Sequence, residues 1–112
     1  MNISIPDQRR VLNTYDHDKQ SLVHAEELAE LTQALSKMRR RPTGYDSLEL
    51  LDNLIEEIAD SLICIEQMMV MYGISPMEIQ TVVNTKCLRQ EERMNRESSK
   101  KQKSWEVHHE PD

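Results

Sequence analysis

Phenylalanine is absent from this chain of 112 residues, and glycine occurs only twice. Runs of β-branched and aromatic residues, which strands favour, are also missing apart from Val82-Val83 inside a helical pattern. Leucine, methionine, glutamate, glutamine, lysine and arginine are abundant instead, and these residues have high helix propensity. The composition therefore predicts an all-α protein. Since one domain of this length has only a small core, we expect a helical bundle completed by oligomerisation.

Long apolar runs and metal-type cysteine spacings are lacking too. Cys64 and Cys87 each lie inside a helical apolar pattern, without CxxC spacing or a pair of histidines beside them. We interpret both as buried small hydrophobic residues in a reducing compartment. The first ten residues lack the apolar core of a signal peptide, and no stretch approaches the ~20 apolar residues of a membrane span. We therefore expect a cytoplasmic protein with no membrane partner.

Basic residues are outnumbered by acidic ones, 14 to 20, which gives a formal net charge of −6. Phosphate backbones attract basic surfaces, so this charge argues against a general nucleic-acid-binding protein, and we predict no nucleic-acid partner. The charge does not argue against an enzyme acting on nucleotides. A metal ion bound at a cluster of acids would reverse the local sign of the charge.

Apolar residues recur at intervals of three and four in three segments. This period predicts long helices over about 21–40, 47–72 and 76–95, and we expect a short helix around 6–14. The apolar stripe of the first long helix is Leu22, Ala25, Leu28, Leu31, Leu35 and Met38, and that of the second is Leu51, Leu54, Ile55, Ile58, Leu62, Ile65 and Met69.

Turn and capping residues mark the ends of these helices. Ser21 is the predicted N-cap of the first long helix, and Ser75-Pro76 the predicted start of the third. Pro42-Thr43-Gly44 predicts a turn between the first two long helices, and Gly73 predicts the end of the second.

The segment 97–112 is polar and shows no apolar period. We predict that it is a disordered tail and that residues 1–96 form the domain.

An internal repeat stands out within the first two long helices. The sequence of residues 26–30, Glu-Glu-Leu-Ala-Glu, recurs thirty residues later as Glu-Glu-Ile-Ala-Asp at 56–60. The acids at the second and last places of the two copies are Glu27, Glu30, Glu57 and Asp60. Each pair lies ~60° apart on its helix, at the edge of the apolar stripe. If the two helices pack as an antiparallel hairpin through these stripes, the four carboxylates converge.

Four converging carboxylates repel one another unless cations lie between them. Oxygen ligands of this kind suit Mg²⁺ or Mn²⁺, which bridge phosphate oxygens and lower the pKa of a bound water. A spare carboxylate, Glu26 or Glu56, is then a candidate to orient or deprotonate that water. The alternative is that these acids form a solvated helix face. A di-iron site is disfavoured, because no histidine follows the acids at Glu-x-x-His spacing.

The EExxE pattern followed by ExxD, in the context EELAEL…EEIADSLI, resembles the motif of the MazG-like, all-α nucleoside triphosphate pyrophosphohydrolase superfamily. The resemblance covers about residues 20–95. It implies that Glu27, Glu30, Glu57 and Asp60 bind Mg²⁺, with Glu26 in the first place of the motif. It also implies hydrolysis of the α–β bond of a nucleoside triphosphate to a monophosphate and pyrophosphate, by a homodimer or homotetramer.

Several other assignments follow from this interpretation. The family's third helix carries a basic residue for the phosphates, and Lys86 fits that place. Asn53 lies one turn before Glu57, where it could contact a sugar or a metal-bound water. His24 is expected to face away from Glu27. Two other interpretations remain: a non-enzymatic helical adaptor that binds a partner through its methionine-rich stripe, and, within the superfamily, a phosphoribosyl-ATP pyrophosphohydrolase.

Overall fold

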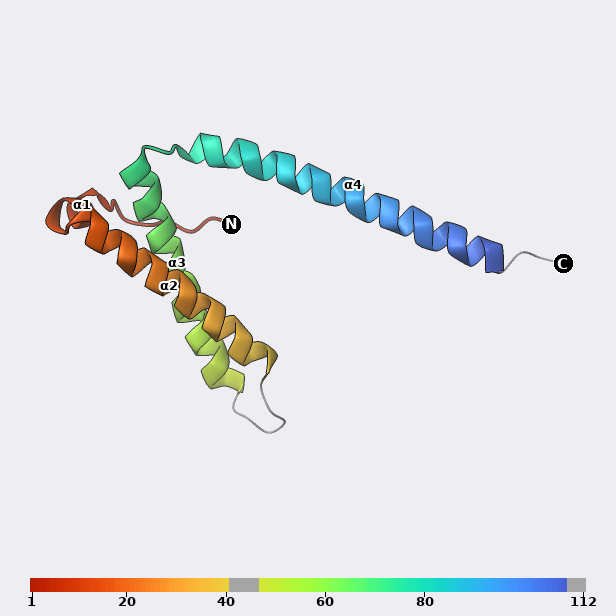
Figure 1. Ribbon diagram of the computed structural model, residues 1–112, viewed down its shortest axis with the longest axis horizontal. Coiled ribbons are helices and arrows are strands. Elements are labelled where there is room, and N and C mark those ends of the chain that lie inside the picture. Colours follow the sequence, from red (N-terminus) through yellow and green to blue (C-terminus); the bar gives the residue numbers. More distant parts are fainter. Residues whose placement is uncertain (41–46, 109–112) are drawn as a thin grey trace. The chain divides into compact units, whose positions relative to one another are not determined.

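The computed structural model describes residues 1–40 and 47–108. It contains four α-helices and, in those residues, no strand, so the predicted all-α class is confirmed. The helices are α1 (Arg9–Thr14), α2 (His17–Arg39), α3 (Ser47–Tyr72) and α4 (Pro76–His108), as Figure 1 shows. The turn predicted at Pro42-Thr43-Gly44 lies outside the described residues. The chain divides into two compact units, Met1–Ile74 and Ser75–Asp112, which are described separately.

Helix α2 begins four residues earlier than Ser21, the predicted N-cap. Its N-cap is Asp16, whose carboxylate accepts hydrogen bonds from the backbone N–H groups of Asp18 and Lys19 at 2.9 and 3.1 Å. The first turn is polar, so the apolar period that located the helix could not reveal its start. The carboxylate satisfies two of the N–H groups that have no partner within the helix.

Helix α3 has the predicted bounds, and its C-terminal end has the predicted cause. Gly73 adopts a φ of 64°, a conformation that side chains with a Cβ atom disfavour. This allows the backbone N–H of Ile74 to donate to the carbonyl of Met69 at 2.9 Å, while that of Gly73 donates to Val70 at 3.4 Å. These two bonds form a Schellman motif and satisfy carbonyls of the last helical turn.

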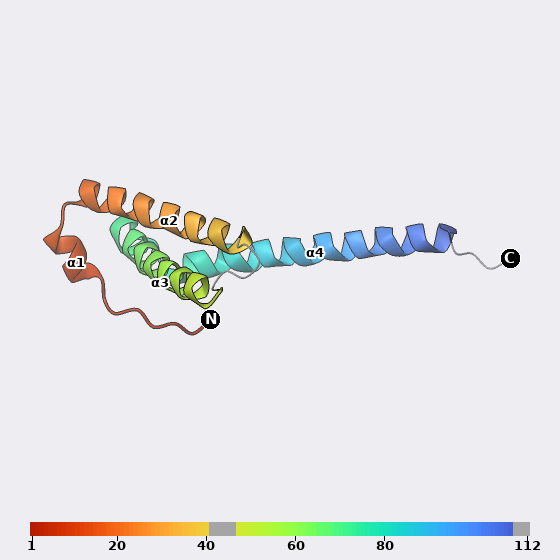
Figure 2. The same cartoon turned by 90° about the horizontal axis from the view of Figure 1, so that it is seen from below.

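Helices α2 and α3 form an antiparallel hairpin, seen side by side in Figures 1 and 2. The expectation that they pack through their apolar stripes is only partly right. Leu28, Leu31 and Leu54 are half-buried, but Leu22, Leu35 and Ile55 are 66 %, 53 % and 56 % exposed. The buried residues of the two helices are instead small or polar: His24 and Ala34 on α2, and Ser61, Cys64 and Gln67 on α3. One hairpin is too small to cover all of its leucine and isoleucine side chains.

Helix α4 begins at Pro76, as predicted. The Ser75 hydroxyl accepts a hydrogen bond from the Glu78 backbone N–H at 3.2 Å, and the Glu78 carboxylate accepts one from the Ser75 N–H at 2.7 Å. The bond from the Ser75 N–H is the main cause that lowers the pKa of Glu78. This reciprocal pair is a capping box, and proline suits the first helical position because it has no N–H to satisfy.

The predicted end of α4 near residue 95 is wrong, because the helix continues to His108. The segment after Arg96 therefore does not start a non-helical tail. Its glutamate, lysine and glutamine residues are compatible with a helix, and no glycine or proline interrupts them before Pro111. No single helix in the described residues is long and apolar enough to cross a membrane.

Candidate metal centre

Three of the four predicted metal ligands meet between α2 and α3. Glu27 on α2, and Glu57 and Asp60 on α3, each offer a carboxylate oxygen within 4.8 Å of the other two. Glu27 and Glu57 are half-buried, whereas Asp60 is exposed. The two copies of the repeat thus come together, as expected from their matching positions on the two helices.

The fourth predicted ligand, Glu30, lies outside this group of three but close to it. Burial raises the pKa of both Glu27 and Glu57, and the negative charge of Glu30 raises both further. Glu30 is exposed on α2 one turn after Glu27. It therefore lies at the open side of the cluster.

The carboxyls of Glu27 and Glu57 are harder to ionise than ordinary glutamates. Burial is the main cause that raises the pKa of each, and the neighbouring charges of Glu30 and Asp60 raise both further. Desolvation and like charges both disfavour the ionised form of an acid. A bound cation would reverse the second effect, because it stabilises the ionised form.

Two carboxylate oxygens and a hydroxyl at this cluster are buried without a hydrogen-bond partner among the described residues. They are Glu27 Oε2, Glu57 Oε2 and Ser61 Oγ. Buried polar atoms are nearly always paired, so such orphaned acceptors require an explanation. A divalent cation supplies one, and a donor set made only of oxygen suits Mg²⁺ or Mn²⁺.

Cys64 is buried on α3 one turn after Asp60, and its thiol is harder to ionise than an ordinary one in the metal-free protein. Burial raises the pKa of its thiol, and the charges of Glu27 and Asp60 raise it further. The thiol therefore stays protonated and acts as a small apolar group, as predicted. Cys87 differs from the prediction: it is exposed, because the described side chains of α4 do not pack against other parts of their unit.

The remaining predicted site residues lie outside the group of three. Glu26 and Glu56 are exposed, and the charge of Glu56 adds a small upward contribution to the pKa of Glu57. Asn53 is half-buried on α3, one turn before Glu57. Their catalytic and substrate-binding roles stay predictions.

Lys86, the predicted phosphate ligand, is exposed on α4 in the second unit. It is the first of six basic residues spaced by three and four positions, which places them along one face of the helix. These residues are Lys86, Arg89, Arg93, Arg96, Lys100 and Lys103. From Lys86 to Lys103, α4 therefore has a charge period, which apolar periodicity alone does not reveal.

His24 does not face away from Glu27, so that expectation is wrong. Three residues along a helix correspond to a rotation of 300°, which leaves the two side chains only ~60° apart. His24 is buried against α3, where its ring Nε2 lies 2.7 Å from Gln67 Oε1. Gln20 and His24 are four residues apart and lie on one face of α2, which is the spacing of residues that contact a neighbouring helix. The sequence does not show which polar side chain of α3 they meet.

The raised pKa values predict how the stability of the metal-free protein depends on pH. Because the folded-state pKa of Glu27 and Glu57 is raised, the folded protein binds more protons than the unfolded chain above the ordinary glutamate pKa of ~4.3. Unfolding free energy then falls as pH rises through this window. In EDTA, we expect a higher melting temperature at pH 5 than at pH 7, and a smaller difference in Glu57→Gln. A melting temperature that rises between pH 5 and 7 equally in both proteins would contradict this.

The lowered pKa of the Asp7 carboxyl does not interfere with that measurement. The Arg9 guanidinium bonds to the Asp7 carboxylate and lowers its pKa to about 2. A lowered folded-state pKa contributes stability that is lost only as pH falls below the ordinary aspartate value of ~3.9. This contribution is therefore constant between pH 5 and 7.

Comparisons of this chain with protein-family models, with curated proteins and with solved structures gave no match.

Proposed function

We propose that this protein is a Mg²⁺-dependent nucleoside triphosphate pyrophosphohydrolase, which cleaves the α–β phosphoanhydride to a nucleoside monophosphate and pyrophosphate. The observation that carries the proposal is the convergence of Glu27, Glu57 and Asp60 around buried oxygens without partners. The resemblance of the EExxE and ExxD patterns to the MazG-like superfamily supports the same reaction. A solvated helix face does not account for the buried, unpartnered oxygens of Glu27 and Glu57.

In this proposal, Glu27, Glu30, Glu57 and Asp60 would hold Mg²⁺ or Mn²⁺, which would supply charge neutralisation at the phosphates and a more acidic bound water. Glu26 or Glu56 orients that water and accepts its proton. Asn53 contacts the sugar or a metal-bound water, and a phosphate contact of Lys86 is what the family resemblance implies.

The test is a screen for pyrophosphate release over ribo- and deoxynucleoside triphosphates, with phosphoribosyl-ATP included. We expect equal amounts of monophosphate and pyrophosphate from at least one substrate, and only when Mg²⁺ or Mn²⁺ is present. Turnover of phosphoribosyl-ATP alone would identify the related pyrophosphohydrolase of the same superfamily. Absence of turnover, or release of orthophosphate, would contradict the proposed reaction.

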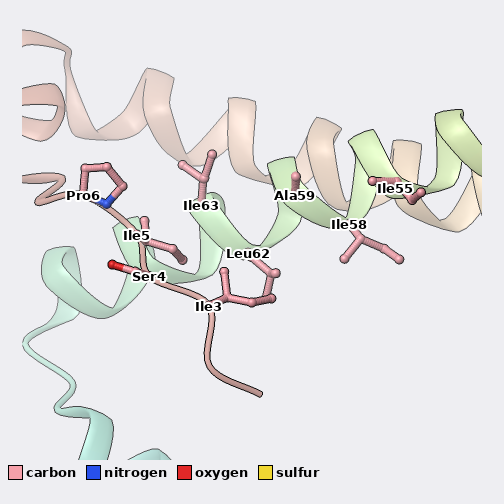
Figure 3. Close-up of a pocket in the computed structure, with 9 residues that line it drawn as sticks. All are labelled: Ile3, Ser4, Ile5, Pro6, Ile55, Ile58, Ala59, Leu62 and Ile63. Atoms are coloured by element: carbon pink, nitrogen blue, oxygen red, sulfur yellow. The ribbon is translucent and has the colours of Figure 1, made fainter.

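We also propose that the protein is a homodimer or homotetramer, because α3 exposes a row of large apolar side chains. Leu51, Ile55, Ile58 and Ile65 are 43 %, 56 %, 43 % and 42 % exposed. Ile55 and Ile58 of this row also line an open pocket of about 340 Å³ between the N-terminal segment and α3, where Ile3 lies next to Leu62 (Figure 3). Its lining is almost entirely apolar: Ile3, Ser4, Ile5, Pro6, Ile55, Ile58, Ala59, Leu62 and Ile63. Monomeric proteins rarely leave such a surface uncovered.

Light scattering coupled to gel filtration measures the oligomeric state directly. At micromolar concentration we expect a mass of two or four times the 13.2 kDa of one chain. A charged residue within the exposed row, as in Ile55→Glu, should shift the mass toward the monomer. A monomeric mass for the wild-type protein would contradict the proposed assembly.

A further inference from the structure

A buried hydrogen-bond network centred on Gln67 connects three parts of the first unit. Gln67 Oε1 accepts from Gln20 Nε2 at 2.9 Å and lies 2.7 Å from His24 Nε2, and both of these residues belong to α2. Gln67 Nε2 donates to Gln8 Oε1, at the N-cap of α1, at 2.9 Å. His24 and Gln67 are 3 % and 6 % exposed. They are among the most buried side chains of the hairpin, although both are polar.

Each group in this network has a fixed role. Gln8 Nε2 donates to the carbonyl of Pro6 at 2.8 Å, and a carbonyl can only accept, so the orientation of the Gln8 amide is set. Gln8 Oε1 then requires the Nε2 of Gln67, which turns Gln67 Oε1 toward α2. His24 must therefore carry its hydrogen on Nε2. The donors and acceptors of the network therefore have one consistent assignment. In it, Gln67 Oε1 accepts from both Gln20 Nε2 and His24 Nε2.

The network fixes the register of the hairpin next to the metal ligands. His24 and Glu27 are one turn apart on α2, and Asp60 and Gln67 are two turns apart on α3. In an antiparallel pair, the bonds from Gln67 to α2 place Glu27 opposite the turn that begins at Asp60, and the carboxylate oxygens of these two residues lie within 4.8 Å of each other. Sliding one helix by a single turn would move Glu27 by ~5.4 Å. This shift exceeds the 4.8 Å within which the three carboxylate oxygens lie, so it would separate Glu27 from the other two acids.

Apolar packing covers only part of the contact between α2 and α3. Much of the apolar stripes of α2 and α3 is exposed, and the buried contact residues Ala34 and Ser61 are small. Hydrogen bonds are directional, and a satisfied buried network can specify one arrangement where apolar contacts allow several. We propose that His24 and Gln67 are positioning residues for the metal centre: their buried bond sets the register in which Glu27 meets Glu57 and Asp60. This inference rests on the proposed Mg²⁺ site, but not on any particular substrate.

Calorimetric titration of Mg²⁺ into the full-length protein tests the inference without a substrate. We expect His24→Leu to weaken Mg²⁺ binding about tenfold or more, as substitutions behind metal ligands commonly do. His24→Gln should bind within about threefold of wild type, because its amide N–H₂ can donate to Gln67 from nearly the same place. Ala34→Gly is the matched control: it destabilises α2 at a buried position without touching the network, and should retain wild-type affinity.

A milder variant covers the case in which His24→Leu does not fold. Gln20→Leu removes only the bond of a half-buried donor, and we expect it to weaken Mg²⁺ binding about threefold. Wild-type affinity in both leucine variants would overturn the inference, as would an equal loss in Ala34→Gly. If wild type itself does not bind Mg²⁺, the proposed metal centre fails and this inference fails with it. The positioning role is supported if the two leucine variants bind Mg²⁺ weakly while Ala34→Gly binds it as tightly as wild type does.

Discussion

Replacing Glu57 with glutamine is expected to reduce Mg²⁺-dependent pyrophosphate release by about a hundredfold or more. Glutamine has nearly the same size, but it removes a negative charge whose buried oxygen has no other partner among the described residues. A metal ion at a phosphoryl centre contributes several kcal/mol of charge stabilisation, and each ~1.4 kcal/mol corresponds to a factor of ten in rate. Loss of one ligand therefore removes at least two factors of ten.

Glu49→Gln is the matched control for this substitution. It makes the same chemical change on the same helix at an exposed position eight residues earlier, outside the group of three carboxylates. Its rate should stay within about a factor of two of wild type, as surface substitutions of this kind seldom matter. Equal activity in Glu57→Gln and Glu49→Gln would contradict the assigned site. The helical adaptor would be favoured by two results together: wild type shows no turnover, and Glu57→Gln still binds a partner protein as wild type does.

Local signals in the sequence were sufficient to predict much of the fold. The bounds of α3 followed from the turn residues before it and from Gly73 after it, whose φ of 64° completes the Schellman motif. The start of α4 followed from Ser75-Pro76, since a capping box requires only four consecutive residues. The convergence of Glu27, Glu57 and Asp60 followed from the repeat, because matching places on two antiparallel helices can face each other.

Non-local pairing was not predictable in the same way. The bonds that join Gln8, His24 and Gln67 connect residues up to 59 positions apart, and no local period shows which polar residues will be buried together. The contact face of the hairpin was misjudged for a related reason. Apolar stripes indicate which surfaces should leave water, but a partner subunit can cover them as well as a neighbouring helix.

Magnesium is expected to stabilise the folded protein strongly and in a saturable way. Burial raises the pKa values of Glu27 and Glu57, and the like charges held close together in the metal-free cluster raise them further. A cation that binds only the folded state adds RT ln(1 + [L]/Kd), which is ~2.7 kcal/mol at a hundredfold excess over Kd. For a domain of this size, each kcal/mol raises the melting temperature by roughly 4–8 °C.

Asp60→Asn should separate metal binding from charge repulsion. The substitution removes one negative charge from the cluster, so the metal-free variant should be at least as stable as metal-free wild type. It also removes an exposed ligand, so the stabilisation by Mg²⁺ should largely disappear together with hydrolysis. If the acids form only a solvated face, the variant should instead lie within about half a kcal/mol of wild type with and without Mg²⁺.

The most direct test of the metal centre is a thermal melt of wild type and Asp60→Asn in EDTA, in MgCl₂, and in NaCl of equal ionic strength. The proposed site predicts a saturable rise of the wild-type melting temperature in MgCl₂ that NaCl does not reproduce, and little or no such rise in Asp60→Asn. General screening of charge would act alike for both salts and both proteins. Equal shifts of wild type in MgCl₂ and in NaCl would contradict the metal centre and, with it, the proposed hydrolysis.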